Sequence, residues 1–207
     1  IITKYKRSFV MEVVIIKYNA GNIQSVLFAL ERAGVQAIVS DDINIIQSAD
    51  KIIFPGVGEA STAMRYLRER NLDQLIKNLK QPVLGICLGM QLLCQHSEEN
   101  DTECLGIFEN VLVKKFNPPN RELKVPQIGW NTIGLLKTTL FENVSENSYC
   151  YFVHSYYAAL SNFTIASAEY GRTYSAALKK DNFYGVQFHP EKSASIGEKI
   201  IHNFLSI

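Results

Sequence analysis

Short apolar runs alternate with stretches of helical spacing through the first half of the chain. The runs lie at 12–17, 35–39, 51–54 and 82–86, and their aliphatic and β-branched side chains are typical of buried strands. Between them, apolar residues recur every three or four positions at 23–30, 64–79 and 88–96, as in helices that cover a core. This alternation predicts a mostly parallel central sheet with helices on both faces and a site at the carboxyl ends of its strands.

The second half is richer in strand-like runs, which lie at 110–114, 150–157, 164–170, 174–179 and 183–188. We expect them to extend the sheet, giving a flavodoxin-like α/β fold with an antiparallel strand extension in the C-terminal half. Residues 193–207 carry apolar side chains at helical spacing and predict a closing helix. No repeat or linker interrupts the pattern, so we expect a single domain over 11–207.

Composition narrows the possible classes of protein. The 207 residues are 47% hydrophobic and 20% charged, with a net charge of +1, so no basic patch is indicated for nucleic acid or a membrane surface. No apolar run approaches the roughly 20 residues of a membrane-spanning helix, and 1–10 lacks the apolar core of a signal peptide. We therefore expect a cytoplasmic protein. Because Met11 directly precedes the first strand, we interpret residues 1–10 as a non-native or disordered leader.

Four cysteines occur, and their spacing matches no zinc motif. In a reducing compartment they are expected to be free thiols, and we expect neither a metal nor another cofactor. We interpret Cys94, Cys104 and Cys150 as small buried apolar residues. Cys87 differs because it stands between two glycines at the end of a predicted strand.

The segment 85–89, Gly-Ile-Cys-Leu-Gly, leads from a predicted strand straight into a predicted helix. Such a unit is typical of a nucleophile elbow, here with a thiol as the nucleophile. Gly85 and Gly89 supply a permissive backbone at the sharp turn. The helix terminus favours the thiolate of Cys87, and the N–H of Leu88 is left free to bind an oxyanion. The alternative is a packed cysteine whose glycines allow close contact between helix and strand.

A thiolate nucleophile needs a base, and the base needs a group that orients it. The histidines are His96, His154, His189 and His202. His96 and His202 are predicted on helix surfaces, and His154 lies inside a strand. His189 follows the strand 183–188, where Pro190 ends strand pairing and the carboxylate of Glu191 can turn back to the imidazole. We predict Cys87, His189 and Glu191 as nucleophile, base and orienting group, against the alternative of a turn with an incidental ion pair.

Two further features suit acyl chemistry. The segment 55–58, Pro-Gly-Val-Gly, also follows a strand, and its glycines allow backbone N–H groups to face a ligand as a second oxyanion donor. An ordinary strand-to-helix turn is the alternative. Gln91 lies one helical turn beyond Cys87, so its amide can face the same pocket; the alternative is solvent exposure.

Residues 85–91 (GICLGMQ) and 185–191 (GVQFHPE) together resemble the class I, triad-type glutamine amidotransferases. Four more segments, at 18–26, 55–58, 125–131 and 151–157, are similar to the glutaminase subunits of imidazole glycerol phosphate synthases, which serve histidine biosynthesis. The resemblance extends from Met11 to the C-terminus. It departs at Gln127 and Ile128, where these subunits commonly carry His-Met.

The resemblance implies that the chain hydrolyses L-glutamine through a γ-glutamyl thioester on Cys87. The oxyanion would be held by Leu88 and by the loop of Gly56, Val57 and Gly58. His189 would protonate the departing ammonia and then activate water.

The amino-acid end of the glutamine would be held by Gln91 and by the backbone around Ser155 and Tyr156. These assignments also follow from the resemblance.

A partner is implied as well. The resemblance predicts a heterodimer with a (β/α)₈-barrel cyclase, which receives the ammonia and forms imidazole glycerol phosphate and an aminoimidazole carboxamide ribonucleotide. Asn22, Trp130, Tyr151 and Lys192 are predicted to dock the partner or gate the site, although Trp130 and Tyr151 could simply pack. We also expect the loop 56–58 to rearrange before it donates an N–H, which would make glutamine hydrolysis depend on the partner's substrate site.

Three other functions remain open. The chain could be a glutaminase for anthranilate, aminodeoxychorismate, pyridoxal phosphate or purine synthesis, which the segments 18–22 and 129–131 disfavour. It could be a thiol peptidase of related fold, which the order of the His-Pro-Glu motif disfavours. The third alternative is a non-catalytic, regulatory or scaffold member of the fold. Such a protein would be expected to lack one of Cys87, His189 or Glu191, yet all three are present.

Overall fold

The computed structural model describes residues 11–18, 23–117 and 123–207. The first half of the chain builds a parallel sheet in the order β2-β1-β3-β4, which β13 extends. These strands are β1 (Val13–Ile16), β2 (Ala37–Ser40), β3 (Lys51–Phe54), β4 (Val83–Ile86) and β13 (Phe183–Val186). The predicted parallel sheet is confirmed, and Gly85 of β4 stands in register with Gly185 of β13.

The predicted antiparallel extension is also confirmed, with one correction. Beyond β13 the sheet continues through β12, β10 and β7 in antiparallel pairs, then to β5 and β6, while β11 pairs with β12. The added strands are β12 (Thr173–Lys180), β10 (Tyr156–Ala158), β7 (Phe108–Lys115), β5 (Cys94–Ser97), β6 (Thr102–Glu103) and β11 (Thr164–Glu169). The run at 183–188 was expected in this extension, yet β13 pairs parallel with β4 and joins the two halves.

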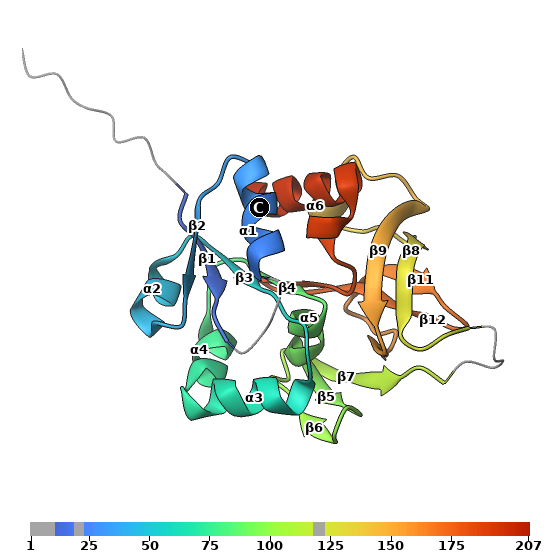
Figure 1. Cartoon of the computed structure of the whole chain (residues 1–207), viewed down its shortest axis with the longest axis horizontal. Coiled ribbons are helices and arrows are strands. Elements are labelled where there is room, and N and C mark those ends of the chain that lie inside the picture. The colour runs from blue at the N-terminus through green and yellow to red at the C-terminus, as the bar shows by residue number, and fades with distance from the viewer. Residues whose placement is uncertain (1–10, 19–22, 118–122) are drawn as a thin grey trace, which may run out of the picture.

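Helices cover both faces of the sheet (Figure 1). On one side lie α1 (Ile23–Arg32) and α6 (Ala194–Ser206), and on the other lie α3 (Ala60–Glu69), α4 (Leu72–Asn78) and α5 (Leu88–Leu93). The strand β1 shows why two layers form: Val13 and Ile15 join the core under α1 and α6, whereas Val14 and Ile16 join the core over α3 and α4. Alternate side chains of a strand point to opposite faces, so a continuous apolar run requires cover on both.

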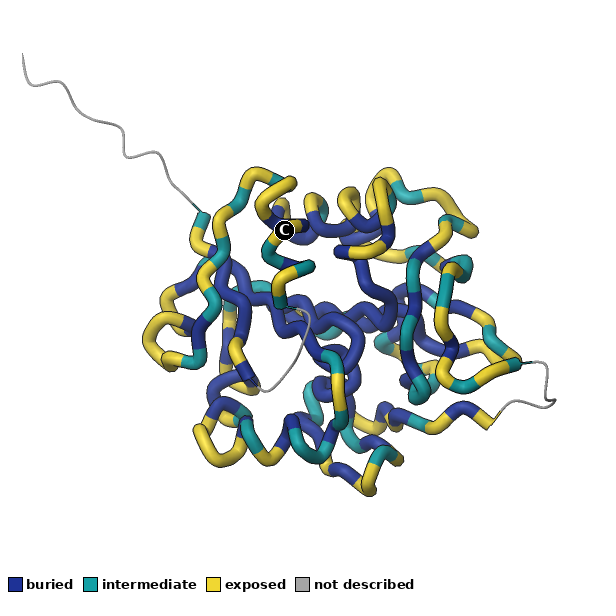
Figure 2. The backbone as a smooth tube through the Cα atoms, viewed as in Figure 1, coloured by how far each residue is buried: buried dark blue, intermediate teal, exposed yellow. Residues whose placement is uncertain are grey.

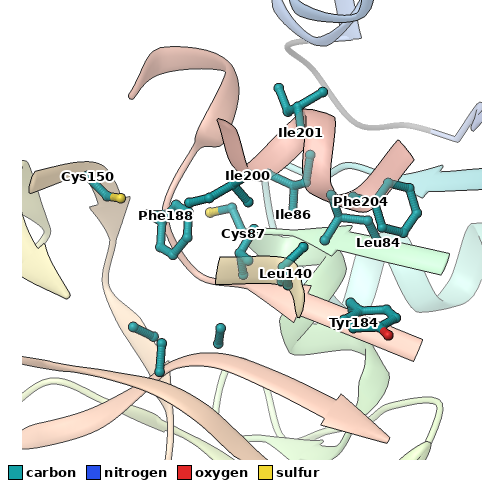
Figure 3. Close-up of a cluster of buried hydrophobic side chains, with 14 of the residues drawn as sticks. Leu84, Ile86, Cys87, Leu140, Cys150, Tyr184, Phe188, Ile200, Ile201 and Phe204 are labelled. Atoms are coloured by element: carbon teal, nitrogen blue, oxygen red, sulfur yellow. The ribbon is translucent and has the colours of Figure 1, made fainter. Parts of the chain in front are cut away.

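Burial follows this layering, with buried backbone concentrated in the central strands (Figure 2). The carboxyl end of β4 enters the core beneath α6, where Leu84, Ile86 and Cys87 lie close to Ile200 and Phe204 (Figure 3). The short helix α2 (Ile43–Ser48) lies beside the edge strand β2, and the 3₁₀ turns η1 (Thr139–Phe141) and η2 (Pro190–Lys192) complete the connections. Among the described residues, no helix is both long and apolar enough to cross a membrane.

Three predicted elements are corrected. The helix expected over 88–96 ends at Leu93, after which β5 pairs with β7. The run 150–157 divides at Ser155 between two sheets, because β9 (Ser148–His154) pairs with β8 (Gln127–Ile133) in a separate ribbon. The helical stretch 64–79 is two helices, separated at Asn71 by a left-handed residue with φ 56°.

Candidate active site

The elbow places Cys87 at the carboxyl end of β4 and directly before α5. Its φ of 54° and ψ of −110° lie outside the regions that side chains ordinarily occupy, so the strain of the turn falls on the cysteine itself. The N–H of Cys87 donates to the carbonyl of Val186 at 2.8 Å, which ties the turn to β13. Backbone strain at a single residue between a strand and a helix is the geometry that nucleophile elbows share.

The flanking glycines are required for space rather than for a permissive backbone, which corrects the expectation from the sequence. Neither Gly85 nor Gly89 has a positive φ. A Cβ at Gly89 would lie 1.8 Å from the backbone oxygen of Phe54, and one at Gly85 would lie 2.9 Å from the backbone of α5. The glycines therefore let α5 pack directly on β3 and β4.

The structure brings His189 and Glu191 together beside the elbow. Nδ1 of His189 lies 2.8 Å from Oε1 of Glu191, and both side chains are buried. The backbone N–H of His189 donates to Tyr151 at 2.9 Å, and Ser193 Oγ donates to the carbonyl of His189 at 2.7 Å. Three hydrogen bonds therefore fix His189: one at its ring, one at its backbone N–H and one at its carbonyl. Pro190 begins η2 immediately after it.

Charge around His189 outweighs the effect of its burial. Burial opposes the charged imidazole, but the Cys87 sulfur, by its charge and a hydrogen bond, and the Glu191 carboxylate raise the pKa of His189 to about 10. An imidazolium beside a sulfur is the arrangement that activates thiol nucleophiles.

One cavity of about 310 Å³ contains most of the predicted site. Nine predicted residues line it: Val57, Gly58, Cys87, Leu88, Gln91, Ser155, Tyr156, His189 and Lys192. Four further lining residues come from the structure alone: Glu99, Pro126, Val153 and His154. Gly56 and Glu191 do not line it; they line a smaller pocket, which His189 also lines.

The predicted oxyanion donor, the N–H of Leu88, is already in a hydrogen bond. The N–H of Leu88 was expected to be free, but it donates to the carbonyl of Gly56 at 3.2 Å. Gly56 is itself confined, because a Cβ there would lie 2.2 Å from the hydroxyl oxygen of Tyr18. Gly58 follows with φ 117°, a conformation that side chains rarely adopt. In this state the carbonyl of Gly56 accepts the N–H that the sequence analysis predicted as the oxyanion donor.

Gln91 is buried and does not face solvent. Its Nε2 donates to the carbonyl of Tyr156 at 2.8 Å and to Oε1 of Gln187 at 2.9 Å. The carbonyl of Tyr156 also contacts Nδ1 of His154 at 2.7 Å. Two side chains thus fix the Ser155–Tyr156 turn at the wall of the cavity.

His154 and Glu99 are pocket residues that the sequence reasoning did not assign. Burial lowers the pKa of His154 to about 4, with nearby His189 acting in the same direction and its backbone hydrogen bond opposing both. The ring is therefore neutral at pH 7 and donates from Nδ1. Glu99 accepts from the N–H of Ala60 at 2.8 Å, and its burial raises its pKa. No motif marks Glu99, because it reaches the cavity only through the loop after β5.

The four predicted docking residues differ in their surroundings. Trp130 on β8 and Tyr151 on β9 are paired across the ribbon, with ring centroids 5.8 Å apart in an edge-on contact. They do pack together, yet Trp130 remains 55% exposed. Lys192 is exposed at the cavity, and Asn22 lies outside the described residues.

Within the described part of the chain, no group of three or more His, Cys, Asp or Glu side chains is placed to hold a metal ion. The four cysteines are free thiols and are buried.

A parallel sheet with a cysteine elbow, a buried His–Glu pair and an adjacent cavity defines a class of enzyme. The chain belongs to the class I glutamine amidotransferases, whose family model matches residues 14–207. Solved structures share the fold at low identity. A Thermoplasma acidophilum protein, described as a putative GMP synthase subunit, has a TM-score of 0.73 at 18% identity, covering 95% of this chain and 93% of that one. PurLQS from Thermotoga maritima has a TM-score of 0.66 at 17% identity, covering 95% and 98%.

Within this class the chain belongs to the HisH family, the subunits named for imidazole glycerol phosphate synthase. The subunit HisH of Bacteroides thetaiotaomicron is 57% identical over 197 residues, which cover 95% of this chain and all of the relative. The HisH subunit of Shewanella sediminis is 49% identical over 199 residues, covering 94% of this chain and 90% of the relative. The resemblance noted in the sequence is therefore confirmed.

Proposed function

We propose that this chain is the glutaminase subunit of an imidazole glycerol phosphate synthase and hydrolyses L-glutamine to glutamate and ammonia. The observation that carries the proposal is the meeting of Cys87, His189 and Glu191 beside one cavity. It is supported by 57% identity to HisH, which disfavours an amidotransferase for another acceptor.

Hydrolysis proceeds in two steps on this geometry. The thiolate of Cys87 attacks the side-chain amide carbon of glutamine, and the protonated His189 gives its proton to the departing nitrogen, so that ammonia leaves and a γ-glutamyl thioester remains. His189 then takes a proton from water, and the resulting hydroxide cleaves the thioester to release glutamate. Glu191 holds Nδ1 of the ring at 2.8 Å, which keeps Nε2 available for both transfers.

The amino-acid end of the substrate lies at the other end of the cavity. The backbone around Ser155 and Tyr156 receives the α-carboxylate, in a turn that Gln91 and His154 hold rigidly. The carboxylate of Glu99 lines the same cavity and is the partner we assign to the α-ammonium group.

The loop at 56–58 must rearrange before the oxyanion is fully stabilised. While Leu88 donates to the carbonyl of Gly56, the N–H of Leu88 is not available to the tetrahedral intermediate. Turning the peptide that carries the Gly56 carbonyl away from Leu88 would free one N–H and bring a second toward the cavity. We assign this rearrangement to the assembled enzyme, where the partner's substrate site controls it.

The outer face of the β8–β9 ribbon is the docking surface for a (β/α)₈-barrel cyclase. Ile128 and Trp130 on β8 share a face with Tyr149 and Tyr151 on β9, since alternate residues of paired strands point the same way. Ile128, Trp130 and Tyr149 are 64%, 55% and 60% exposed. Val153 continues this face to the wall of the cavity, so a partner seated on the ribbon lies beside the place where ammonia forms.

The cyclase uses the ammonia to form imidazole glycerol phosphate and an aminoimidazole carboxamide ribonucleotide. A cytoplasmic location stays a prediction from the sequence.

A single variant tests the proposal. Cys87→Ala, assembled with a cyclase subunit, should lose glutamine-dependent product formation by at least about 10³-fold, as expected when a covalent nucleophile is removed. Ammonia-dependent product formation should stay within about twofold, because the cyclase site is untouched. Cys94→Ala, which alters a buried thiol away from the cavity, is the matched control. Glutamine-dependent activity that survives in Cys87→Ala would overturn the proposal.

A further inference from the structure

Gln187 contacts the nucleophile but has no part in the two steps above. It follows β13 directly, is fully buried, and its backbone N–H donates to Ala176 at 2.8 Å. Its side-chain Nε2 lies 3.7 Å from Sγ of Cys87, within hydrogen-bonding distance for sulfur. A buried amide that ends on the reacting sulfur requires an explanation, because an apolar side chain would fill the same space without the cost of burying polar atoms.

The orientation of this amide is determined by a chain of hydrogen bonds that begins at a backbone carbonyl. The carbonyl of Tyr156 can only accept, so the atom of Gln91 that faces it at 2.8 Å must be the amide nitrogen. The second proton of that nitrogen points to Gln187 at 2.9 Å, so the facing atom of Gln187 must be its oxygen. The NH₂ group of Gln187 is therefore turned toward Cys87, and the backbone itself settles an assignment that is otherwise ambiguous in amides.

The sulfur has two opposing polar neighbours besides His189. The carbonyl of Val153 lies 3.7 Å from Sγ and can only accept, so it favours the thiol. The NH₂ of Gln187 can only donate, so it favours the thiolate. Unlike His189, Gln187 keeps its proton throughout the reaction and faces the sulfur both before and after the imidazolium has given its proton away.

We propose that Gln187 is a catalytic residue that donates a hydrogen bond to the Cys87 thiolate, and that Gln91 is the positioning residue that aims it. The inference rests on the proposed function only in taking Cys87 as the nucleophile. When His189 has protonated the leaving ammonia, the charge that stabilised the sulfur is lost. Gln187 then remains as its hydrogen-bond donor, and the same contact stabilises the thiolate when the thioester is cleaved.

The first experiment measures the thiolate without any substrate. The rate of Cys87 alkylation by iodoacetamide is followed against pH in the isolated chain, with the modified residue identified by mass spectrometry. Gln187→Leu should move the midpoint of this profile upward by about one pH unit, equivalent to about tenfold slower alkylation below the midpoint, as for loss of one charge-assisted hydrogen bond. Gln187→Met, which has similar length and no donor, should give the same shift and serves if the leucine variant fails to fold.

Controls separate this role from packing. Gln81→Leu removes an amide that donates to the carbonyl of Ile46 outside the site, and it should leave the alkylation profile unchanged. Gln91→Met leaves the donor in place but removes the group that aims it, so the midpoint should rise by less than in Gln187→Leu. A folded Gln187→Leu or Gln187→Met variant with the wild-type midpoint would overturn the inference.

Steady-state kinetics in the complex with the cyclase supply the second readout. Gln187→Leu should lower kcat for glutamine hydrolysis by about tenfold with KM within about twofold, because the lost bond acts on the sulfur and not on the amino-acid end. A change confined to KM would contradict the role. A wild-type complex without glutaminase activity would instead contradict the proposed function. In that case the alkylation profile would still test whether Gln187 stabilises the thiolate of Cys87.

Discussion

His154 is a buried side chain that affects both the stability of the fold and the wall of the cavity. It contacts Tyr156 from Nδ1 at 2.7 Å and Tyr174 from Nε2 at 3.5 Å, and it lies among the rings of Phe116 and Phe152. An aromatic cluster of this kind solvates a charged imidazole poorly, which is why burial lowers the pKa of His154 to about 4. The residue is therefore a neutral donor that supports the wall of the cavity.

The lowered pKa of His154 predicts a loss of stability in acid. Between pH 6.5 and pH 4 the unfolded chain binds a proton at this histidine that the folded chain does not, so the free energy of unfolding falls as pH decreases. The full contribution is about 3 kcal/mol. His154→Asn, which keeps a donor near the position of Nδ1 but cannot be protonated, should remove this part of the pH dependence in urea unfolding.

His202→Asn is the matched control for that measurement. His202 lies on the exposed side of α6, so its replacement should leave the slope of stability against pH as it is in the wild type. If the two variants behave alike between pH 7 and pH 4.5, buried neutral His154 is not the source of the acid sensitivity.

At the scale of elements, the elbow works because β3, β4 and α5 are in backbone contact. Gly89 of α5 leaves no room for a Cβ against the carbonyl of Phe54 in β3. Cys87 can hold its strained backbone because the surrounding elements are packed tightly enough to over-determine it. Cys87 is thus positioned by strand ends and a helix start.

Gly89→Ala should therefore destabilise the protein strongly. The new Cβ would stand 1.8 Å from Phe54 O, which no rotamer change can relieve, so α5 must move away from β3. We expect a loss of about 3 kcal/mol or more in urea unfolding, together with loss of glutamine hydrolysis. Gly134→Ala meets no backbone atom and approaches only the carboxylate of Glu146, at 3.1 Å, so it should cost clearly less than Gly89→Ala. Equal stability in the two variants would contradict the packing argument.

The β8–β9 ribbon predicts a separation between stability and partner binding. Because Trp130 is 55% exposed, Trp130→Ala should cost the isolated chain about 1 kcal/mol or less, mainly from its edge-on contact with Tyr151. Loss of a central aromatic contact should weaken cyclase binding by at least about tenfold, measured by titration calorimetry.

Ile45→Ala is the control for docking. Ile45 is 39% exposed on α2, which lies at the opposite edge of the molecule from the ribbon (Figure 1). Its replacement should leave the affinity unchanged. Weakened binding in Ile45→Ala, or normal binding in Trp130→Ala, would place the interface elsewhere.

At the scale of the whole molecule, the predicted catalytic side chains lie together, but the predicted oxyanion donor is engaged in another hydrogen bond. Cys87, His189 and Glu191 lie together, whereas the N–H of Leu88, which we propose as an oxyanion donor, donates to the carbonyl of Gly56. Each missing oxyanion donor costs roughly 10²- to 10³-fold in kcat. Under the proposed mechanism, attack is possible in this state but its intermediate is poorly stabilised.

The isolated chain should accordingly release glutamate very slowly. Adding the cyclase together with its ligand should raise the rate by about 10²-fold or more, measured as glutamate formed per subunit, because the loop then offers an N–H to the oxyanion. Cyclase without ligand is the control and should give a smaller increase. A lone subunit that already works at the full rate would show that Gly56 does not limit the reaction.

Local chemistry explains why so much of the site could be predicted. The elbow and the His-Pro-Glu turn each lie within a few residues, at the ends of apolar runs whose length and flanks mark them as strands. Where the prediction was wrong, tertiary pairing overrode local pattern. Residues 94–97 continue a helical spacing but pair with β7 instead, and 150–157 divides because its two parts find partners in different sheets.

The sequence by itself determined the layered α/β architecture, the elbow at Cys87 and the presence of His189 and Glu191 at a strand end. These depend on periodicity and on neighbours along the chain. Only the tertiary structure decided that the N–H of Leu88 donates to the carbonyl of Gly56, that Glu99 and Val153 reach the cavity, and that Gln187 faces the sulfur of Cys87. Such contacts join residues 32 to 100 positions apart, and their hydrogen-bond geometry depends on how the sheet and its helices pack, which no local pattern encodes.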